Sequence, residues 1–296
     1  MPDGTAVSGE FKSKGSDTMK TRIITAAISA ALLLAVLFSP WTALLTVAVS
    51  LICGVAVYEV ITVMGLAKYR DSSIAAVLFS VLCPWFSRMN GGFVFVVFLL
   101  YVLAMLVFWF LSRETLSLEK TGKMFITSLL ISLSLSCLSH LRMAGVKRDS
   151  DGLFYVFLAL IIAWMADSGA YFIGTFFGKH KLCPRLSPKK TVEGLFGGIA
   201  TSVLMSLFAG FIYQSCVLSG EACVSYGEIF VLSLICAPLS VLGDLFASSI
   251  KRRNGAKDFG KIFPGHGGMM DRFDSLLFVL PVVYLAIRVF PLVYQV

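Results

Sequence analysis

Long apolar stretches separated by short polar connections run through almost the whole chain. A helix needs roughly 20 apolar residues in a row to cross the hydrocarbon core of a bilayer. About nine stretches approach this length. They cover residues 22–39, 41–65, 72–89, 91–112, 122–141, 152–175, 195–216, 228–250 and 273–294. The pattern therefore predicts an all-α fold, a polytopic membrane helix bundle of about nine transmembrane helices.

Two of these stretches differ from a simple apolar span. The stretch 72–89 is short, and the stretch 122–141 contains five serines. Serine hydroxyls at helical spacing form hydrogen bonds between neighbouring helices inside a membrane. We therefore expect the helix over 122–141 to lie in the interior of the bundle. The serines are Ser128, Ser132, Ser134, Ser136 and Ser139.

The composition is that of a membrane protein. Of the 296 residues, 57% are hydrophobic and only 14% are charged, and the mean hydropathy is +0.86. A soluble domain usually carries about a quarter charged residues, so the composition excludes a soluble fold. The seven cysteines stand singly, without the paired spacing of zinc ligands, and we expect them to be small buried residues.

The basic residues are distributed unevenly between the two sides of the predicted bundle. If the N-terminus is cytoplasmic, twenty of the 25 Lys and Arg residues fall on the cytoplasmic side and five on the other. The positive-inside rule then predicts a cytoplasmic N-terminus and an external C-terminus. This distribution accounts for the net charge of +8 without a nucleic-acid partner, and we expect no nucleic acid to bind.

The N-terminal segment is polar and is followed by a long apolar run. We expect residues 1–20 to form a disordered cytoplasmic tail, because they are rich in Gly, Ser, Lys, Asp and Thr. The run Ile23–Phe38 is too long for the apolar core of a cleavable signal peptide. We expect this run to be a membrane anchor.

Polar stretches that contain candidate functional residues begin in the second half of the chain. The first extends from Asp167 to Tyr171 and lies inside the predicted helix over 152–175. A carboxylate at membrane depth costs at least about 2.5 kcal/mol. Asp167 is therefore expected to face the bundle interior, a water-filled cavity or a cation. The alternative is an aspartate whose carboxylate is satisfied by a neighbouring serine or by the backbone.

The second polar stretch ends at the start of a predicted helix. Backbone N–H groups at a helix N-terminus favour anions, and Ser and Thr hydroxyls beside lysines suit phosphate oxygens. The candidate phosphate-binding residues are Lys179, Ser187, Lys189, Lys190 and Thr191. The alternative is a solvated basic loop that fixes the topology or contacts anionic lipid.

The third and richest polar stretch covers residues 243–275. Asp244 and Asp274 flank it at the edges of apolar segments, and between them aspartates alternate with basic residues. Mg²⁺ takes oxygen ligands and is commonly held by one or two carboxylates together with substrate phosphates. Asp244 and Asp271 are the candidate metal ligands, with Asp167 as a third.

His266 lies in a Pro-Gly-His-Gly-Gly run within the third stretch. It is a candidate for orienting a substrate or for handling a proton, although a lone histidine is more commonly structural. The chain has only three histidines, and no cysteine stands beside His266. We therefore expect no zinc site.

The run from Ser248 to Asp274 closely resembles the signature of the phosphatidate cytidylyltransferases, also called CDP-diacylglycerol synthases. The matching positions are Ser248, Ile250, Lys251, Arg252, Lys257, Asp258, Gly260, Pro264, His266, Gly267, Gly268, Asp271, Arg272 and Asp274. The two upstream polar stretches also resemble motifs of this family, so the resemblance covers roughly residues 164–275. One position departs from the pattern, because many relatives carry Glu where this chain has Ala247.

The resemblance implies an enzyme that converts CTP and phosphatidate to CDP-diacylglycerol and pyrophosphate in phospholipid biosynthesis. It implies a paired metal centre at Asp244 and Asp271, with Mg²⁺ bound and K⁺ a candidate for the second cation. The implied catalytic residues are Asp244, Asp271, Lys257, Asp258, His266, Arg272 and Asp274. The implied substrate-binding residues are Asp167, Lys179, Ser187, Lys189, Lys190, Thr191, Ser248, Lys251, Arg252, Gly267 and Gly268.

The expected setting is a multi-pass membrane protein. In a bacterium we expect it in the inner (plasma) membrane, with the active site facing the cytoplasm. Its expected partners are CTP, phosphatidate and the lipid bilayer, and a homodimer is a candidate assembly. We expect one integral membrane unit, with N-terminal transmembrane helices over 21–150 and a C-terminal transmembrane catalytic region over 151–296.

Two other functions are consistent with a polar site on a membrane bundle. A CTP-dependent lipid or polyprenol kinase shares the membrane and the nucleotide but transfers the γ-phosphoryl group. A transporter fits a bundle with an intramembrane aspartate, but the chain has no inverted repeat and its polar residues gather on one face. A degenerate, inactive relative is disfavoured because the signature is intact.

Overall fold

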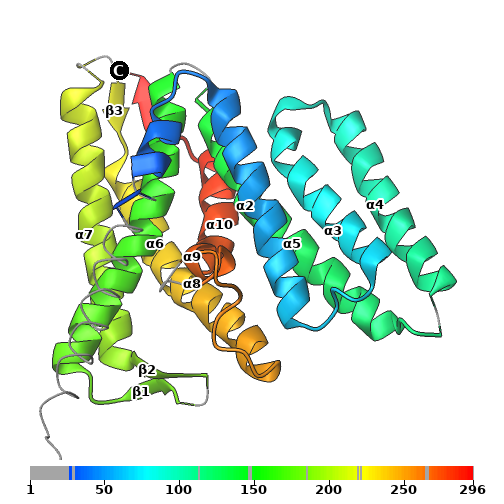
Figure 1. The fold of residues 1–296 in the computed structure, drawn as a ribbon. Coiled ribbons are helices and arrows are strands. Elements are labelled where there is room, and N and C mark those ends of the chain that lie inside the picture. The colour runs from blue at the N-terminus through cyan, green and yellow to red at the C-terminus, as the bar shows by residue number, and fades with distance from the viewer. Residues whose placement is uncertain are drawn as a thin grey trace, which may run out of the picture.

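Helices make up most of the chain in the computed structural model (Figure 1). The structure describes residues 27–28, 31–112, 114–145, 149–184, 186–218, 220, 222–263 and 267–295. The long helices are α2 (Thr42–Val63), α4 (Gly91–Leu111), α5 (Leu118–Met143), α6 (Asp149–Phe177), α7 (Val192–Cys216) and α8 (Tyr226–Arg253). The shorter helices are α3 (Arg70–Leu82), the 3₁₀ helix η1 (Cys83–Arg88), α9 (Met270–Phe273) and α10 (Leu276–Val289).

Two small antiparallel sheets complete the fold. Strands β1 (Lys181–Cys183) and β2 (Ser187–Thr191) form a hairpin just before α7. Strands β3 (Ala222–Val224) and β4 (Val293–Gln295) pair near the C-terminus. The two sheets lie at opposite ends of the bundle (Figure 1).

The helical, polytopic membrane fold expected from the sequence is confirmed. Among the described residues, six helices are long and apolar enough to cross a membrane, namely α2, α4, α5, α6, α7 and α8. The expected number of about nine is therefore not confirmed. Residues 23–26 and 29–30 of the predicted anchor and the whole of the expected tail, residues 1–20, lie outside the described residues.

Two of the predicted spans are shorter in the structure, each for a local reason. The stretch 72–89 forms α3, which ends at Leu82, and then η1, whose Pro84 lacks the N–H that an α-helix needs. The stretch 273–294 contributes only the 14 residues of α10. At 1.5 Å per residue this helix is about 21 Å long, less than the ~30 Å hydrocarbon core.

The chain folds back into the bundle between α8 and α10. The connection leaves the end of α8 and reaches α9 part of the way up the bundle (Figure 1), and its described residues are 254–263 and 267–269. Irregular backbone at membrane depth is tolerated only where protein or a water-filled cavity surrounds it. The described residues 254–263 and 267–275, called the re-entrant loop below, lie just before α10 and hold several positions of the predicted signature.

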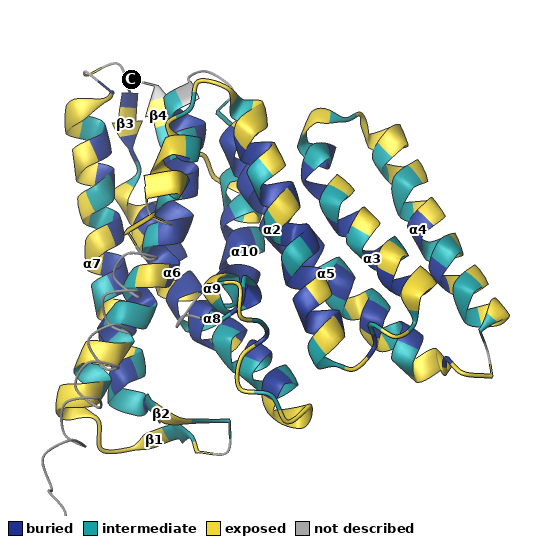
Figure 2. Cartoon of the chain, in the orientation of Figure 1, coloured by how far each residue is buried: buried dark blue, intermediate teal, exposed yellow. Residues whose placement is uncertain are grey.

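The core lies where α2, α5, α6 and α10 face one another, and α4 at the edge is largely exposed (Figure 2). All five serines of α5 are buried, which confirms that this helix lies in the interior. The Ser128 hydroxyl is hydrogen-bonded to the Tyr101 hydroxyl at 2.5 Å. The Ser136 hydroxyl donates to the Leu133 backbone oxygen at 2.8 Å. These short side chains allow α5 to pack closely among its neighbours.

Small residues bring α6 and α7 close together. A Cβ atom on Gly198 would overlap the backbone oxygen of Ala166, and one on Gly169 would lie 2.5 Å from the Thr201 hydroxyl. Lipid tails are as apolar as the helices, so the hydrophobic effect does not stabilise helix association inside a membrane. Close backbone approach stabilises it through van der Waals packing. The resulting pair of helices holds one side of the candidate site.

Candidate functional site

Asp167 lies on α6 and is half-buried among polar groups of other segments. The Ser240 hydroxyl on α8 is 3.5 Å from its Oδ1 atom. The Ser275 side chain, just before α10, lies near this carboxylate. Asp167 therefore faces the bundle interior, where α6, α8 and the end of the re-entrant loop meet. Serine side chains of neighbouring segments accompany it there.

Asp244 lies on α8 one turn beyond Ser240 and forms an ion pair with the β1–β2 hairpin. Its Oδ2 atom is 2.6 Å from Lys190 Nζ, and the two side chains are 28% and 19% exposed, respectively. Its Oδ1 atom is 3.4 Å from the Ser248 hydroxyl. The hairpin thus brings Lys190 over the helix that carries Asp244.

Three carboxylates gather at this junction. Asp167, Asp244 and Asp274 lie close enough for their charges to interact, and Lys190 and Lys251 are the cations that act on them. Gly243 permits the approach, because a Cβ atom there would overlap the Asp274 backbone oxygen. The junction thus brings carboxylates from α6, α8 and the re-entrant loop near two lysines.

Asp271 is the centre of a second, more deeply buried arrangement. Its Oδ1 atom is 2.7 Å from Lys251 Nζ, and both side chains are less than one tenth exposed. Its Oδ2 atom accepts hydrogen bonds from the backbone N–H groups of Phe259 and Gly268, at 2.8 and 2.9 Å. Asp271 therefore connects α8 with two segments of the re-entrant loop, one at Phe259 and one at Gly268.

A cavity of about 540 Å³ opens beside the Asp244–Lys190 pair. This volume lies within the range of about 300–1,000 Å³ that is usual for ligand sites. The polar and small residues that line it are Asp167, Ala170, Tyr171, Gly174, Thr175, Lys181, Ser187, Lys189, Lys190, Thr191 and Asp244. The cavity therefore joins residues of all three polar stretches.

Lys190 is the basic residue best placed to bind a ligand in this cavity. Within the described part of the chain, its Nζ atom is buried and has no hydrogen-bond acceptor beyond the ion pair with Asp244. An ammonium group has three N–H donors. Lys190 therefore retains donors for an anion while Asp244 holds it in place.

The start of α7 also borders the cavity. Thr191 is buried, and its hydroxyl accepts the Gly194 N–H at 3.1 Å, so it acts as the N-cap of α7. Glu193 accepts the backbone N–H groups of Lys179 and His180, at 3.1 and 3.2 Å, and so holds the beginning of the hairpin. These contacts turn the positive end of the α7 dipole toward the cavity.

Several other predicted site residues lie on the surface of the protein. Lys179, Arg252, Lys257, Asp258 and Arg272 are exposed. Gly267 has a φ of +87°, a conformation that suits glycine. The predicted role of His266 lies outside the described residues. The structure thus gathers the two aspartate–lysine pairs, and it leaves the most basic part of the loop on the surface.

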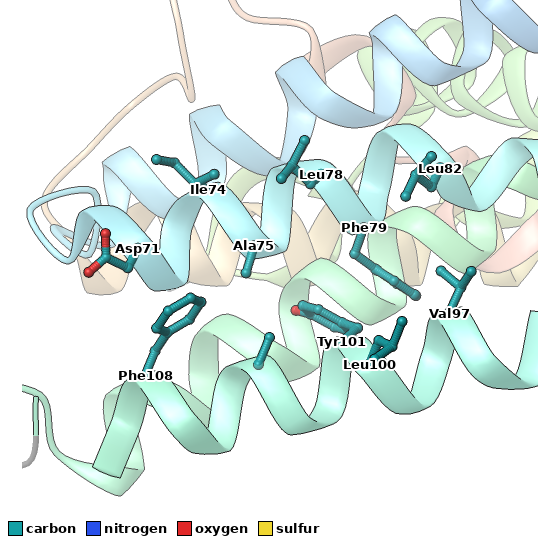
Figure 3. A pocket seen from close by; sticks show the side chains of 11 residues that line it. Asp71, Ile74, Ala75, Leu78, Phe79, Leu82, Val97, Leu100, Tyr101 and Phe108 are labelled. Atoms are coloured by element: carbon teal, nitrogen blue, oxygen red, sulfur yellow. The ribbon is translucent and has the colours of Figure 1, made fainter. Parts of the chain in front are cut away.

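A second cavity, of about 420 Å³, lies between α3 and α4. Its lining side chains are almost all aliphatic or aromatic, with Asp71 at one end and the Tyr101 hydroxyl in the wall (Figure 3). This groove offers no cluster of charged groups. It belongs to the apolar surface of the bundle and is separate from the polar junction.

Sequence reasoning missed Glu59, which lies on α2 outside every predicted motif. Its Oε2 atom accepts the Met270 N–H at 3.0 Å, and the residue is only 5% exposed. The available signal was a single acidic residue in an otherwise apolar predicted span. An ionisable residue within a membrane helix is by default a candidate functional residue.

The donor atoms of the junction are of the type that a hard divalent cation takes. Asp167, Asp244 and Asp274 supply carboxylate oxygens. The predicted ligands Asp244 and Asp271 are each paired with a lysine. Among the described residues, no three His, Cys, Asp or Glu side chains converge on a single point that would hold a metal ion.

Comparison with known proteins gives the family. The chain matches the family model described as "Cytidylyltransferase family" over residues 20–290. This chain belongs to the cytidylyltransferase family. The resemblance drawn from the signature at Ser248–Asp274 is therefore confirmed.

Several curated members of the cytidylyltransferase family named phosphatidate cytidylyltransferase are similar to this chain. The protein of Bacillus subtilis strain 168 is 36% identical over 189 residues, which cover 64% of this chain and 66% of the relative. The Staphylococcus epidermidis protein is 40% identical over 153 residues, which cover 50% and 56%. The Staphylococcus haemolyticus protein is 43% identical over 137 residues, which cover 45% and 49%. The matched part of this chain thus spans about half to two thirds of these relatives.

Proposed function

We propose that this cytidylyltransferase-family protein transfers the cytidylyl group of CTP to phosphatidate, producing CDP-diacylglycerol and pyrophosphate. The printed name of the relatives supports this activity. The structural observation that carries the proposal is the buried Lys190 ammonium, which borders the polar cavity and is held by Asp244. A phosphate-binding cation held by a carboxylate on an apolar helix suits a reaction between a nucleotide and a lipid.

The reaction is a displacement at phosphorus. A phosphate oxygen of phosphatidate attacks the α-phosphorus of CTP, a new P–O bond forms, and the bond to the β-phosphate oxygen breaks as pyrophosphate leaves. A phosphomonoester has a second pKa of about 6, so it is largely ionised at neutral pH. The nucleophile therefore needs no general base.

The main task of the protein is to hold two polyanions together. Lys189 and Lys190 on β2 line the cavity, and the start of α7 adds its positive dipole end. Lys251 acts on Asp274 at the same junction and is positioned by Asp271. Positioning and charge stabilisation carry most catalysis of phosphoryl-type transfer.

Mg²⁺ is the proposed cofactor. Asp244 and Asp271 are the proposed ligands, with Asp167 and Asp274 adjoining, and K⁺ is a candidate for the second cation. When bound, the metal would neutralise phosphate charge. The support for this assignment is the group of carboxylates at the junction.

The proposed setting is the cytoplasmic face of a bacterial inner membrane. The connections that carry most of the basic residues lie at one end of the bundle (Figure 1), and such connections are retained in the cytoplasm. CTP is cytosolic, while the acyl chains of phosphatidate stay in the lipid. A cavity between helices near this end serves both substrates. The homodimer remains a prediction.

An assay with two labelled nucleotides tests the proposal. Purified protein in lipid nanodiscs is incubated with phosphatidate, Mg²⁺ and CTP labelled at either the α- or the γ-phosphate. The expected result is lipid labelled only by the α-phosphate, with one pyrophosphate released for each lipid product. Label from the γ-phosphate in lipid would identify a kinase instead. No turnover of either label would refute an enzymatic function.

A further inference from the structure

Glu59 of α2 is buried directly against the re-entrant loop. Its carboxylate accepts the backbone N–H of Met270, although the two residues are 211 positions apart in the chain. Met270 immediately precedes Asp271, whose carboxylate holds Lys251 and the two segments of the loop. The hydrogen bond that Met270 donates to Glu59 therefore lies one residue away from Asp271.

Two glycines of the signature enclose the Glu59 carboxylate. A Cβ atom on Gly260 would overlap Glu59 Oε1, and one on Gly268 would lie 2.5 Å from both of its oxygens. At each position the three nearest atoms all belong to Glu59. Neither glycine has a positive φ, so backbone conformation does not explain why glycine stands at these positions. The close contact with the Glu59 carboxylate explains it.

We propose that Glu59 is a positioning residue for the reaction. Its carboxylate lies against Gly260 and Gly268 of the re-entrant loop and fixes the position of these two loop segments around Asp271. This inference rests on the proposed cytidylyl transfer. It makes α2 part of the catalytic unit. The catalytic region then extends beyond residues 151–296 into the N-terminal helices.

Glu59 positions the loop through its shape and through a hydrogen bond. Glu59 fills the space between the two glycines and supplies an acceptor for Met270. The amide of glutamine has the same length and retains an oxygen acceptor, whereas alanine provides neither. We therefore expect different kcat values for E59A and E59Q.

The first test is steady-state kinetics of both variants in nanodiscs. E59A should lower kcat by about 10²-fold, the usual cost of a misplacement of about 1 Å. The KM for CTP should change by less than roughly threefold, since the residues that line the polar cavity include Lys189 and Lys190 but not Glu59. E59Q should stay within about threefold of the wild type. E119A, at an exposed glutamate on α5, is the matched control. Wild-type kcat in E59A, or an E59Q as inactive as E59A, would overturn the inference.

The second test is a double-mutant cycle between Glu59 and Gly260. G260A alone should lower kcat by about 10²-fold, because its methyl group displaces the carboxylate. In E59A the methyl group meets no carboxylate, so E59A/G260A should equal E59A within about twofold. A double variant near the product of the two losses, about 10⁴-fold, would overturn the inference. G227A, where an added Cβ meets no atom within 4 Å, is the control for glycine replacement.

Two outcomes separate this inference from the proposed function. If the wild-type protein transfers no cytidylyl group, the proposed function fails whatever Glu59 does. If the wild type is active and E59A is equally active, only the role of Glu59 is refuted. If E59A cannot be purified, E59D takes its place, because the shorter side chain withdraws the carboxylate from both glycines. We then expect E59D and E59D/G260A to have the same kcat within about twofold.

Discussion

The Lys251–Asp271 pair provides a quantitative test of the buried junction. The side chains are 9% and 6% exposed, and their charged atoms are 2.7 Å apart. K251M keeps the length and packing of the side chain but leaves the Asp271 carboxylate without a cation. Removing one partner of a buried ion pair costs about 3–5 kcal/mol. Large chains lose about 2 °C of melting temperature per kcal/mol. We therefore expect K251M to melt about 6–10 °C below the wild type.

Thermal unfolding of the purified protein, followed by intrinsic fluorescence, measures this shift. The exposed pair Lys123–Glu119, with side chains 58% and 74% exposed, provides the control. K123M should melt with the wild type because solvent screens an exposed pair.

A double variant tests whether the two charges act as a pair. D271N should also be destabilised, since it leaves Lys251 buried and uncompensated. K251M/D271N removes both charges and should recover at least about 1.5 kcal/mol relative to the sum of the single losses. Melting shifts that simply add, or a K251M shift no larger than that of K123M, would refute the buried pairing.

Three further changes test other parts of the site. D244N should lower kcat by about 10²-fold or more, because the Lys190 ammonium loses the carboxylate 2.6 Å away; labelled-CTP turnover by monodisperse protein measures this, and wild-type activity would contradict it. T191A should cost about 1 kcal/mol by removing the α7 N-cap, and T191S should restore the melting temperature. G198L should cost about 1–3 kcal/mol because its side chain would force α6 from α7; equal melting of G198L and the control G227L would contradict this packing.

The class of fold and the chemical character of the site were predictable from the sequence. Apolar length is a local property, so the helices α2, α4, α5, α6, α7 and α8 correspond to predicted spans. The burial of the α5 serines followed from the same reasoning. The polar stretches around Asp167, Lys190 and Asp244 were expected to cooperate, and the structure brings them to one cavity.

The partners within the site were not predictable in the same way. Asp244 and Asp271 were expected to act together on metal, whereas the structure pairs them with Lys190 and Lys251, respectively. Thr191 was expected to bind phosphate, and its hydroxyl caps α7. Each of these contacts depends on the rotation and depth of a helix relative to its neighbours. Residue type and spacing along the chain leave both quantities open.

The sequence by itself determined that this is a helical membrane protein with phosphate-directed chemistry in its second half, because hydrophobic length and residue type are read along the chain. Only the tertiary structure decided that the re-entrant loop folds back into the bundle and that α10 begins only at Leu276. It also decided that Glu59, 211 positions before Met270, is buried against this loop. The physical reason is that irregular backbone inside a membrane bundle must find its hydrogen-bond partners on other helices, and packing alone chooses which ones.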